Sequence, residues 1–358
     1  MAYVPPHRRR PSQKDDSPTP EDDETRVNTI NKAISKIACI NLSKRADRWN
    51  SFQSRLQSSL GANFNSNAAH SFLQRIEKFD AVNGVEVCKC HDTTMESGQD
   101  VNVNMNVVEE DVCLDWDATQ NSIHDRHITG PMNKRLTPGE VGCALSHIKL
   151  WREFLECSDM GSDDDAKMLV LEDDAIFYDN APAPQTQTSS WKQRGRDKRH
   201  GVPSKKNGGF LDAFSLLWNC LPSTPTHDFG ILYLGFSARG DKHWLNTNSS
   251  TSTTTRSDGN ISKNEKSSSS SMEVRLFRPT YGFHTHAYII SKTAARILLD
   301  NLPVVGPLDV WLADNQWFGI KNVFCAVVAN EGWKGEGAAL ISQRKHDTRS
   351  DIRQSGRV

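Results

Sequence analysis

The sequence lacks any apolar stretch long enough to span a membrane, and its first residues lack the apolar segment of a signal peptide. Residues 1–33 instead combine prolines and polar side chains with Arg8-Arg9-Arg10, a composition typical of a disordered arm. We therefore expect no transmembrane segment and a cytoplasmic location. Glycosylation sequons at Asn248 and Asn260 leave a secretory route open.

An excess of charge of one sign is also missing. The 43 Lys and Arg residues balance 44 Asp and Glu residues, so the net charge of -1 provides no field to attract nucleic acid, which we exclude as a partner. Cysteines are scattered, and the one tight group, Cys88-Lys89-Cys90-His91, lacks the second ligand pair expected of a zinc site.

Apolar residues are scarce for a chain of 358 residues, since they make up 36% and the mean hydropathy is -0.60. The core must therefore be concentrated in a few segments, separated by stretches that cannot pack. We predict one domain over residues 34–352, with long disordered insertions at about 88–130, 181–209 and 242–272 and a tail at 353–358.

The clearest motif is an apolar run that stops at three carboxylates, Glu172, Asp173 and Asp174. The run Met168–Leu171 is typical of a strand buried on both faces, as in a parallel sheet covered by helices. Adjacent carboxylates repel one another, and a hard divalent cation is a suitable compensating charge. The pattern favours a metal site, with a solvated acidic turn as the alternative.

A second strand is predicted at Ile37–Leu42, followed by a polar turn and a helix with apolar residues at helical spacing from Trp49 to Leu60. Arg45 and Arg48 are expected where this helix begins, a position that suits a diphosphate. The alternative is that Asp47 pairs with these arginines on the surface.

The segment Leu136–Leu155 predicts a helix, because Thr137 and Glu140 form a capping-box pair and an apolar stripe follows. Ser146 and His147 are polar residues within this largely apolar helix. They could face a site, or His147 could be a core histidine bonded to a backbone carbonyl.

Near the end of the chain, Gly282–Ser291 predicts a strand with His284 and His286 at alternate positions, which suits a metal site or a polar pocket wall. Further on, Asp309 lies between a Pro/Gly turn and an apolar helix start. Asp309 is therefore a helix N-cap or a candidate catalytic base.

Four of these blocks, in this order, resemble glycosyltransferase family 25. They are Ile40–Arg48, Leu136–His147, Leu171–Ala175 and Thr285–Ser291, followed by Asp309. The family includes lipopolysaccharide and lipooligosaccharide β-galactosyltransferases and procollagen galactosyltransferases. The resemblance implies a GT-A-like, Rossmann-related α/β fold and a metal-dependent, inverting transfer from a nucleotide-sugar donor, usually UDP-galactose, to a glycan, glycolipid or glycoprotein acceptor.

The resemblance also implies roles for individual residues. Mn²⁺ or another divalent cation would be held by Glu172, Asp173 and Asp174. The donor nucleotide would lie near Asn41, Arg45, Arg48, Ser146 and His147, with His286 and Tyr288 in the donor or acceptor pocket. Inversion needs a carboxylate to accept the proton of the acceptor hydroxyl. We expect Asp309 in that role, with Glu140 as the second candidate.

Two other functions compete with this prediction. A glycoside hydrolase would need two carboxylates across one cleft and no nucleotide site, and Arg45 and Arg48 argue against it. An inactive relative that serves as a binding or scaffold protein would use the polar insertions as contact surfaces. Binding of UDP with Mn²⁺ distinguishes the enzyme from the scaffold.

Overall fold

A computed structural model describes residue 31 and the ranges 34–60, 66–89, 110–120, 133–157, 166–178, 209–221, 229–245, 272–313, 318–330 and 338–343. The N-terminal arm up to residue 30, most of the predicted insertions and the tail lie outside these residues. None of the described helices is long and apolar enough to cross a membrane.

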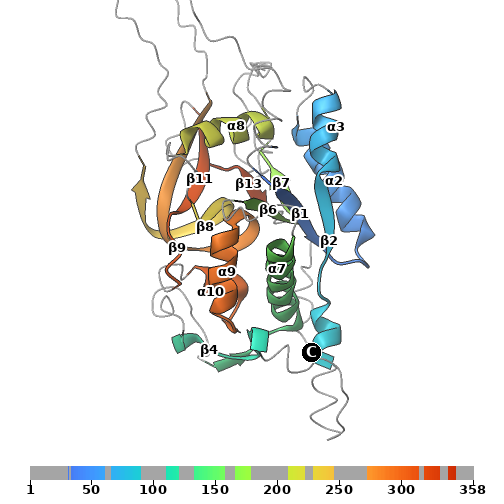
Figure 1. Ribbon diagram of the computed structural model, residues 1–358, viewed down its shortest axis with the longest axis vertical. Coiled ribbons are helices and arrows are strands. Elements are labelled where there is room, and N and C mark those ends of the chain that lie inside the picture. Colours follow the sequence, from blue (N-terminus) through green and yellow to red (C-terminus); the bar gives the residue numbers. More distant parts are fainter. Residues whose placement is uncertain are drawn as a thin grey trace, which may run out of the picture.

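A seven-stranded mixed sheet forms the centre of the molecule (Figure 1). Its order is β12-β11-β8-β9-β6-β1-β2, and the strands are β1 (Lys36–Asn41), β2 (Ile76–Asp80), β6 (Lys167–Glu172), β8 (Ile231–Trp244), β9 (Met272–Ser291), β11 (Val323–Asn330) and β12 (Ala338–Ala339). Strands β2, β1 and β6 are parallel, whereas β9 runs antiparallel to both β6 and β8. The α/β class is thus confirmed, with a mixed sheet instead of a purely parallel one.

Helices cover both faces of this sheet (Figure 1). One face packs against α7 (Pro138–Glu156), α9 (Lys292–Asp300) and α10 (Leu308–Leu312), and the other against α2 (Ala46–Ser59), α3 (Ser66–Gln74) and α8 (Phe210–Cys220). Side chains alternate along each strand, so Ala38 and Ile40 face the α7 layer while Ile37 and Cys39 face the α2 layer. This two-sided burial explains why β1 and β6 are apolar without alternation.

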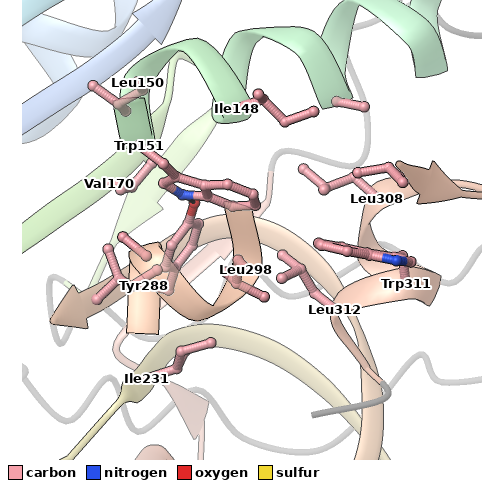
Figure 2. Close-up of a cluster of buried hydrophobic side chains, with 14 of the residues drawn as sticks. Ile148, Leu150, Trp151, Val170, Ile231, Tyr288, Leu298, Leu308, Trp311 and Leu312 are labelled. Atoms are coloured by element: carbon pink, nitrogen blue, oxygen red, sulfur yellow. Dashed lines mark hydrogen bonds between the residues drawn. The ribbon is translucent and has the colours of Figure 1, made fainter. Parts of the chain in front are cut away.

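Figure 2 shows the core on the α7 side, where Trp151 of α7 lies against Tyr288 of β9. The indole Nε1 donates a hydrogen bond of 3.0 Å to the Tyr288 hydroxyl. Both side chains are fully buried, so this polar contact satisfies a donor that would otherwise cost free energy inside the core.

Short strands form three further pairs outside the seven-stranded sheet. They pair as β3 (Val112–Cys113) with β10 (Val304–Val305), β4 (Asp115–Asp117) with β5 (Asn133–Arg135), and β7 (Ala175–Phe177) with β13 (Ile341–Gln343), and a 3₁₀ turn, η1, covers Ala118–Gln120.

Two of the expected insertion boundaries differ from the structure. Strands β3 and β4 lie inside the segment 88–130, because Val112 and Trp116 are buried in the core despite the polar sequence around them. Strand β8 continues to Trp244, past the expected boundary at 242, through its pairing with β9. Ordered structure therefore extends into two segments that composition alone predicts to be unpacked.

Candidate active site

The carboxyl ends of β1 and β6 lie side by side, because Ile40 pairs with Glu172 in this parallel pair. The residues that follow, Asn41 at the end of β1 and Asp173 just after β6, therefore also lie close together. The Asn41 amide donates to the Asp173 carboxylate at 2.6 Å and to the backbone carbonyl of Arg45 at 3.2 Å. Asn41 thus connects the acidic turn to the start of α2.

Arg48 lies in the first turn of α2 and forms ion pairs with both acids of the turn. It contacts Asp173 closely and lies 3.7 Å from Asp174. Asp174 also accepts a hydrogen bond of 3.0 Å from Gln343 of β13. Arg48 lies at the helix start, where its positive charge beside the carboxylates is consistent with a site for a charged ligand.

The third acid, Glu172, points to a different set of partners. Its Oε1 atom accepts a hydrogen bond of 2.8 Å from Thr285 of β9 and lies 3.6 Å from Nε2 of His147. The three carboxylates are therefore held apart by separate neighbours, with Asp173 and Asp174 toward α2 and Glu172 toward α7.

These environments shift the pKa values of the carboxyl groups in opposite directions. Burial, reinforced by the charge of Glu172, raises the pKa of Asp174 to about 6, and burial also raises the pKa of Asp173 despite the charge of Arg48. Burial acts in the same direction on Glu172, but His147, His286 and Thr285 together outweigh it and lower the pKa of Glu172 to about 2.

Helix α7 begins with the predicted capping box. The Thr137 side chain accepts from the Glu140 backbone, and the Glu140 carboxylate accepts from the Thr137 backbone N–H at 2.7 Å. These bonds give Glu140 a structural role, and its action as a base stays a prediction. Ser146 is also engaged, since its hydroxyl donates to Gly142 and accepts from the Val82 backbone N–H.

His147 is almost fully buried, and its ring contacts a side chain instead of a backbone carbonyl. Its Nδ1 atom lies 2.7 Å from the Tyr288 hydroxyl, which already accepts from the Trp151 indole. Tyr288, expected as a pocket residue, is 1% exposed and lies behind His147 in the core. It therefore positions His147 and does not itself face the cavity.

Arg45 differs in position from Arg48. Its guanidinium forms a two-point ion pair with Asp47, with both distances 3.0 Å, which is the surface pairing weighed as the alternative. Arg45 still contributes to the site through its backbone carbonyl, which accepts from Asn41.

Asp309 lies in the first turn of α10, one residue after the helix begins, and not at its N-cap. Its carboxylate accepts from the backbone N–H of His284 at 3.2 Å and from that of Val310 at 2.9 Å. Burial raises the pKa of Asp309, and the charge of Glu172 acts in the same direction. His284 has a φ of 80°, a strained backbone conformation for a non-glycine residue.

A cavity of about 410 Å³ opens where these elements meet. Of the sequence-predicted residues, those lining it are Asn41, Arg48, Ser146, His147, Glu172, Asp173 and Asp174. Lys44 and Gly142 are further lining residues. A Cβ atom added to Gly142 would lie 2.8 Å from the backbone of Gly84, so glycine there allows α7 to approach the cavity wall closely.

Four buried side-chain atoms in the described part of the chain have no hydrogen-bond partner: Asn41 Oδ1, His147 Nε2, Asp174 Oδ1 and His286 Nδ1. All belong to residues that the sequence indicates as site residues. Buried polar atoms without a partner are rare in proteins, and each is a position where a water or an ion can bind. Two of these atoms, on Asn41 and Asp174, are oxygen acceptors on cavity-lining residues, so this part of the site fits a hard, oxygen-preferring cation such as Mn²⁺.

His286 lies against β13, outside the cavity lining. Its Nε2 atom donates to the Ile341 carbonyl at 3.2 Å, because a carbonyl can only accept. The remaining atom, Nδ1, is therefore a bare acceptor, and burial lowers the pKa of this imidazole.

Sequence reasoning overlooked Cys143, Thr285 and Gln343. Cys143 stands four residues before His147 on α7, a spacing that places both on one helix face and could have identified it. Ligand atoms of Cys143, His147 and Glu172 all lie within 4.8 Å of one another, so these residues could hold a metal ion. Gln343 lies next to Asp174 because β13 pairs with β7, and this long-range pairing cannot be recognised from the sequence around either residue.

Residues 34–196 match glycosyltransferase family 25, described as an LPS biosynthesis protein family. This match confirms the family resemblance. A stretch of 48 residues is also 52% identical to the "Procollagen lysyl hydroxylase and glycosyltransferase" of Acanthamoeba polyphaga mimivirus. This stretch is 13% of the present chain and 5% of that relative, so the similarity covers a small part of the viral protein.

Proposed function

Because residues 34–196 match glycosyltransferase family 25, we propose that this protein transfers galactose from UDP-galactose to a hydroxyl group of a glycan or protein-linked acceptor, with inversion and with a divalent cation such as Mn²⁺. We further propose that the mixed sheet is a GT-A-like variant of the Rossmann-related folds. The observation that carries the proposal is the cavity at the ends of β1 and β6, where Arg48 and unpaired acceptor oxygens line one space.

The donor diphosphate would occupy the wall formed by the β1–α2 turn. Lys44 and Arg48 both line this wall, and their positive charges would favour the diphosphate and the negative charge that develops on the departing UDP. Arg48 is now paired with Asp173 and Asp174, so it would exchange part of this pairing for the phosphate.

The cation would be held by the acidic turn, principally by Asp174, with Asp173 and the Asn41 oxygen beside it. When bound, it would supply Lewis-acid stabilisation of the leaving diphosphate. Glu172 would support the turn from the α7 side, where Thr285 and His147 hold it.

Asp309 would act as the general base. Its carboxyl group is held in place by two backbone N–H groups, and the pKa that burial raises makes its carboxylate a better proton acceptor at neutral pH. His286, buried against β13, would support the acceptor side from behind the cavity wall.

Donor binding tests the proposal directly. UDP with Mn²⁺ at about 100 times the dissociation constant should stabilise the protein by about 2.7 kcal/mol, or raise the melting temperature by roughly 5–10 °C. The measurement is a thermal melt with UDP and Mn²⁺, with UDP and chelator, and with Mn²⁺ and adenosine diphosphate as a nucleotide control. An unchanged melting temperature in all three would contradict the proposal and favour a binding or scaffold protein.

Metal affinity should depend on pH through Asp174. Its pKa of about 6 means that the carboxyl group is ionised above pH 6 and protonated below it. Because a proton competes with the cation, the dissociation constant for Mn²⁺ should rise about tenfold for each pH unit below 6. Titration of Mn²⁺ without UDP, followed by electron paramagnetic resonance, avoids the titration of the nucleotide itself. A constant affinity from about pH 5 to pH 7 would rule out Asp174 as the controlling ligand.

A further inference from the structure

We propose that Cys143, His147 and Glu172 form a second metal site in the cavity wall, one that binds a thiophilic transition-metal ion such as Zn²⁺. The site is separate from the oxygen ligands around Asp174. It does not rest on the proposed sugar transfer, although both sites use the same cavity.

The three ligand groups come from two elements whose side chains pack in the same core. Cys143 and His147 lie one turn apart on α7, and Glu172 ends the neighbouring strand β6. Their ligand atoms lie within 4.8 Å of one another, and the His147 and Glu172 atoms are 3.6 Å apart. Ligands of a tetrahedral zinc ion are separated by roughly 3.5 Å, so side-chain movements of about 1 Å would complete the site.

His147 provides the independent indication of a ligand. It is 1% exposed, and its Nε2 atom has no hydrogen-bond partner in the described ranges although it faces Glu172. The other ring nitrogen, Nδ1, lies 2.7 Å from the Tyr288 hydroxyl. Histidines that bind metals commonly donate their second N–H to such a partner, which leaves the first nitrogen bare for the metal.

The ligand set selects the kind of ion. A cysteine sulfur and an imidazole nitrogen favour Zn²⁺ or Co²⁺, whereas Mn²⁺ prefers oxygen ligands such as those of Asp174. All three residues line the cavity, so a fourth coordination position could be filled from it. Three protein ligands with an open position are typical of zinc sites that exchange a water or another small ligand.

The experiment uses the full reduced chain and Co²⁺ as the probe. Binding to Cys143 should produce a near-ultraviolet thiolate-to-cobalt absorption band and a visible spectrum of tetrahedral cobalt, and Zn²⁺ should displace both stoichiometrically. Cys143→Ser should lose the near-ultraviolet band. The matched control is Cys220→Ser, on helix α8 at the opposite face of the sheet, which should keep it.

A second variant tests the site without removing a ligand. Tyr288→Phe keeps the ring but removes the partner of His147 Nδ1, so Co²⁺ affinity should fall about 10- to 100-fold while the band remains. Thermal melts of the metal-free variants control for folding, since Trp151 also loses its acceptor.

Two results would overturn the proposal: the absence of a thiolate band in the parent chain, or a band that survives in Cys143→Ser and disappears in Cys90→Ser. Failure of the proposed sugar transfer would look different. It would remove stabilisation by UDP and Mn²⁺ and leave the cobalt spectrum unchanged.

Discussion

Asp309→Asn is expected to lower the turnover of sugar transfer by about 100- to 10,000-fold, the usual contribution of a positioned general base. An amide cannot accept the proton of the acceptor hydroxyl, so the step that needs a carboxylate fails. Binding of UDP with Mn²⁺ should remain, because Asp309 belongs to α10 and lies outside the cavity lining around Arg48 and Asp174.

The substitution should leave the protein folded. Asp309 accepts two backbone hydrogen bonds through different oxygens, from His284 and Val310, and the asparagine oxygen can retain one of them. Losing the other should cost about 1 kcal/mol, and removing a buried negative charge should offset part of that loss. The expected effect on stability is therefore small beside the effect on rate.

Steady-state kinetics with UDP-galactose and a range of hydroxyl acceptors would measure the change. Asp300→Asn, at the exposed end of α9, is the matched control and should keep the parent rate. If Asp309→Asn turned over within a few-fold of the parent while binding UDP normally, Asp309 would not be the base. Glu140→Gln would then test the second candidate.

Local sequence predicted the elements that carry the site. The apolar runs of β1 and β6 are buried on both faces, and the capping box at Thr137 and Glu140 begins α7 as expected. These features can be predicted from residues close in sequence, because a continuous apolar run indicates a strand covered on both faces and a capping box needs only residues three apart. The position of Arg48 at the start of α2 was predictable for the same reason.

The partners of the acids could not be predicted in this way. Gln343 and Thr285 reach Asp174 and Glu172 across 169 and 113 residues of sequence. Such contacts follow from the order of strands in the sheet, which no local pattern specifies. The long antiparallel strand β9, which places Thr285 and Tyr288 beside β6, is the element that a parallel-sheet interpretation overlooks.

The sequence also left the roles of the two arginines and of Tyr288 undecided. Arg45 is the N-cap residue of α2 and has a non-helical backbone, whereas Arg48 lies within the first turn, so the fold directs Arg48 to the acids and Arg45 to Asp47. Tyr288 is two residues after His286 on β9, so in a regular strand both side chains would lie on the same face of the sheet. In the structure it faces the core beneath α7, where its hydroxyl supports His147.

Asp174→Asn is the second substitution expected to have a large effect, and it should raise the dissociation constant for Mn²⁺ by about 100-fold or more. The asparagine keeps an oxygen but loses the negative charge that a hard cation requires. Glu172→Gln should weaken Mn²⁺ binding much less, because Glu172 is held toward Thr285 and His147, away from Arg48. The comparison therefore decides which carboxylate of the acidic turn binds the ion.

The same two variants should show the opposite order with Co²⁺. Glu172→Gln removes a ligand of the cysteine-containing site and should weaken cobalt binding, whereas Asp174→Asn should leave the thiolate band in place. Mn²⁺ titration by paramagnetic resonance and Co²⁺ titration by absorbance measure the two affinities on the same protein. Two separate sites predict that each variant weakens the binding of only one of the two ions strongly. If each variant weakened Mn²⁺ and Co²⁺ binding to the same extent, a single site would bind both ions.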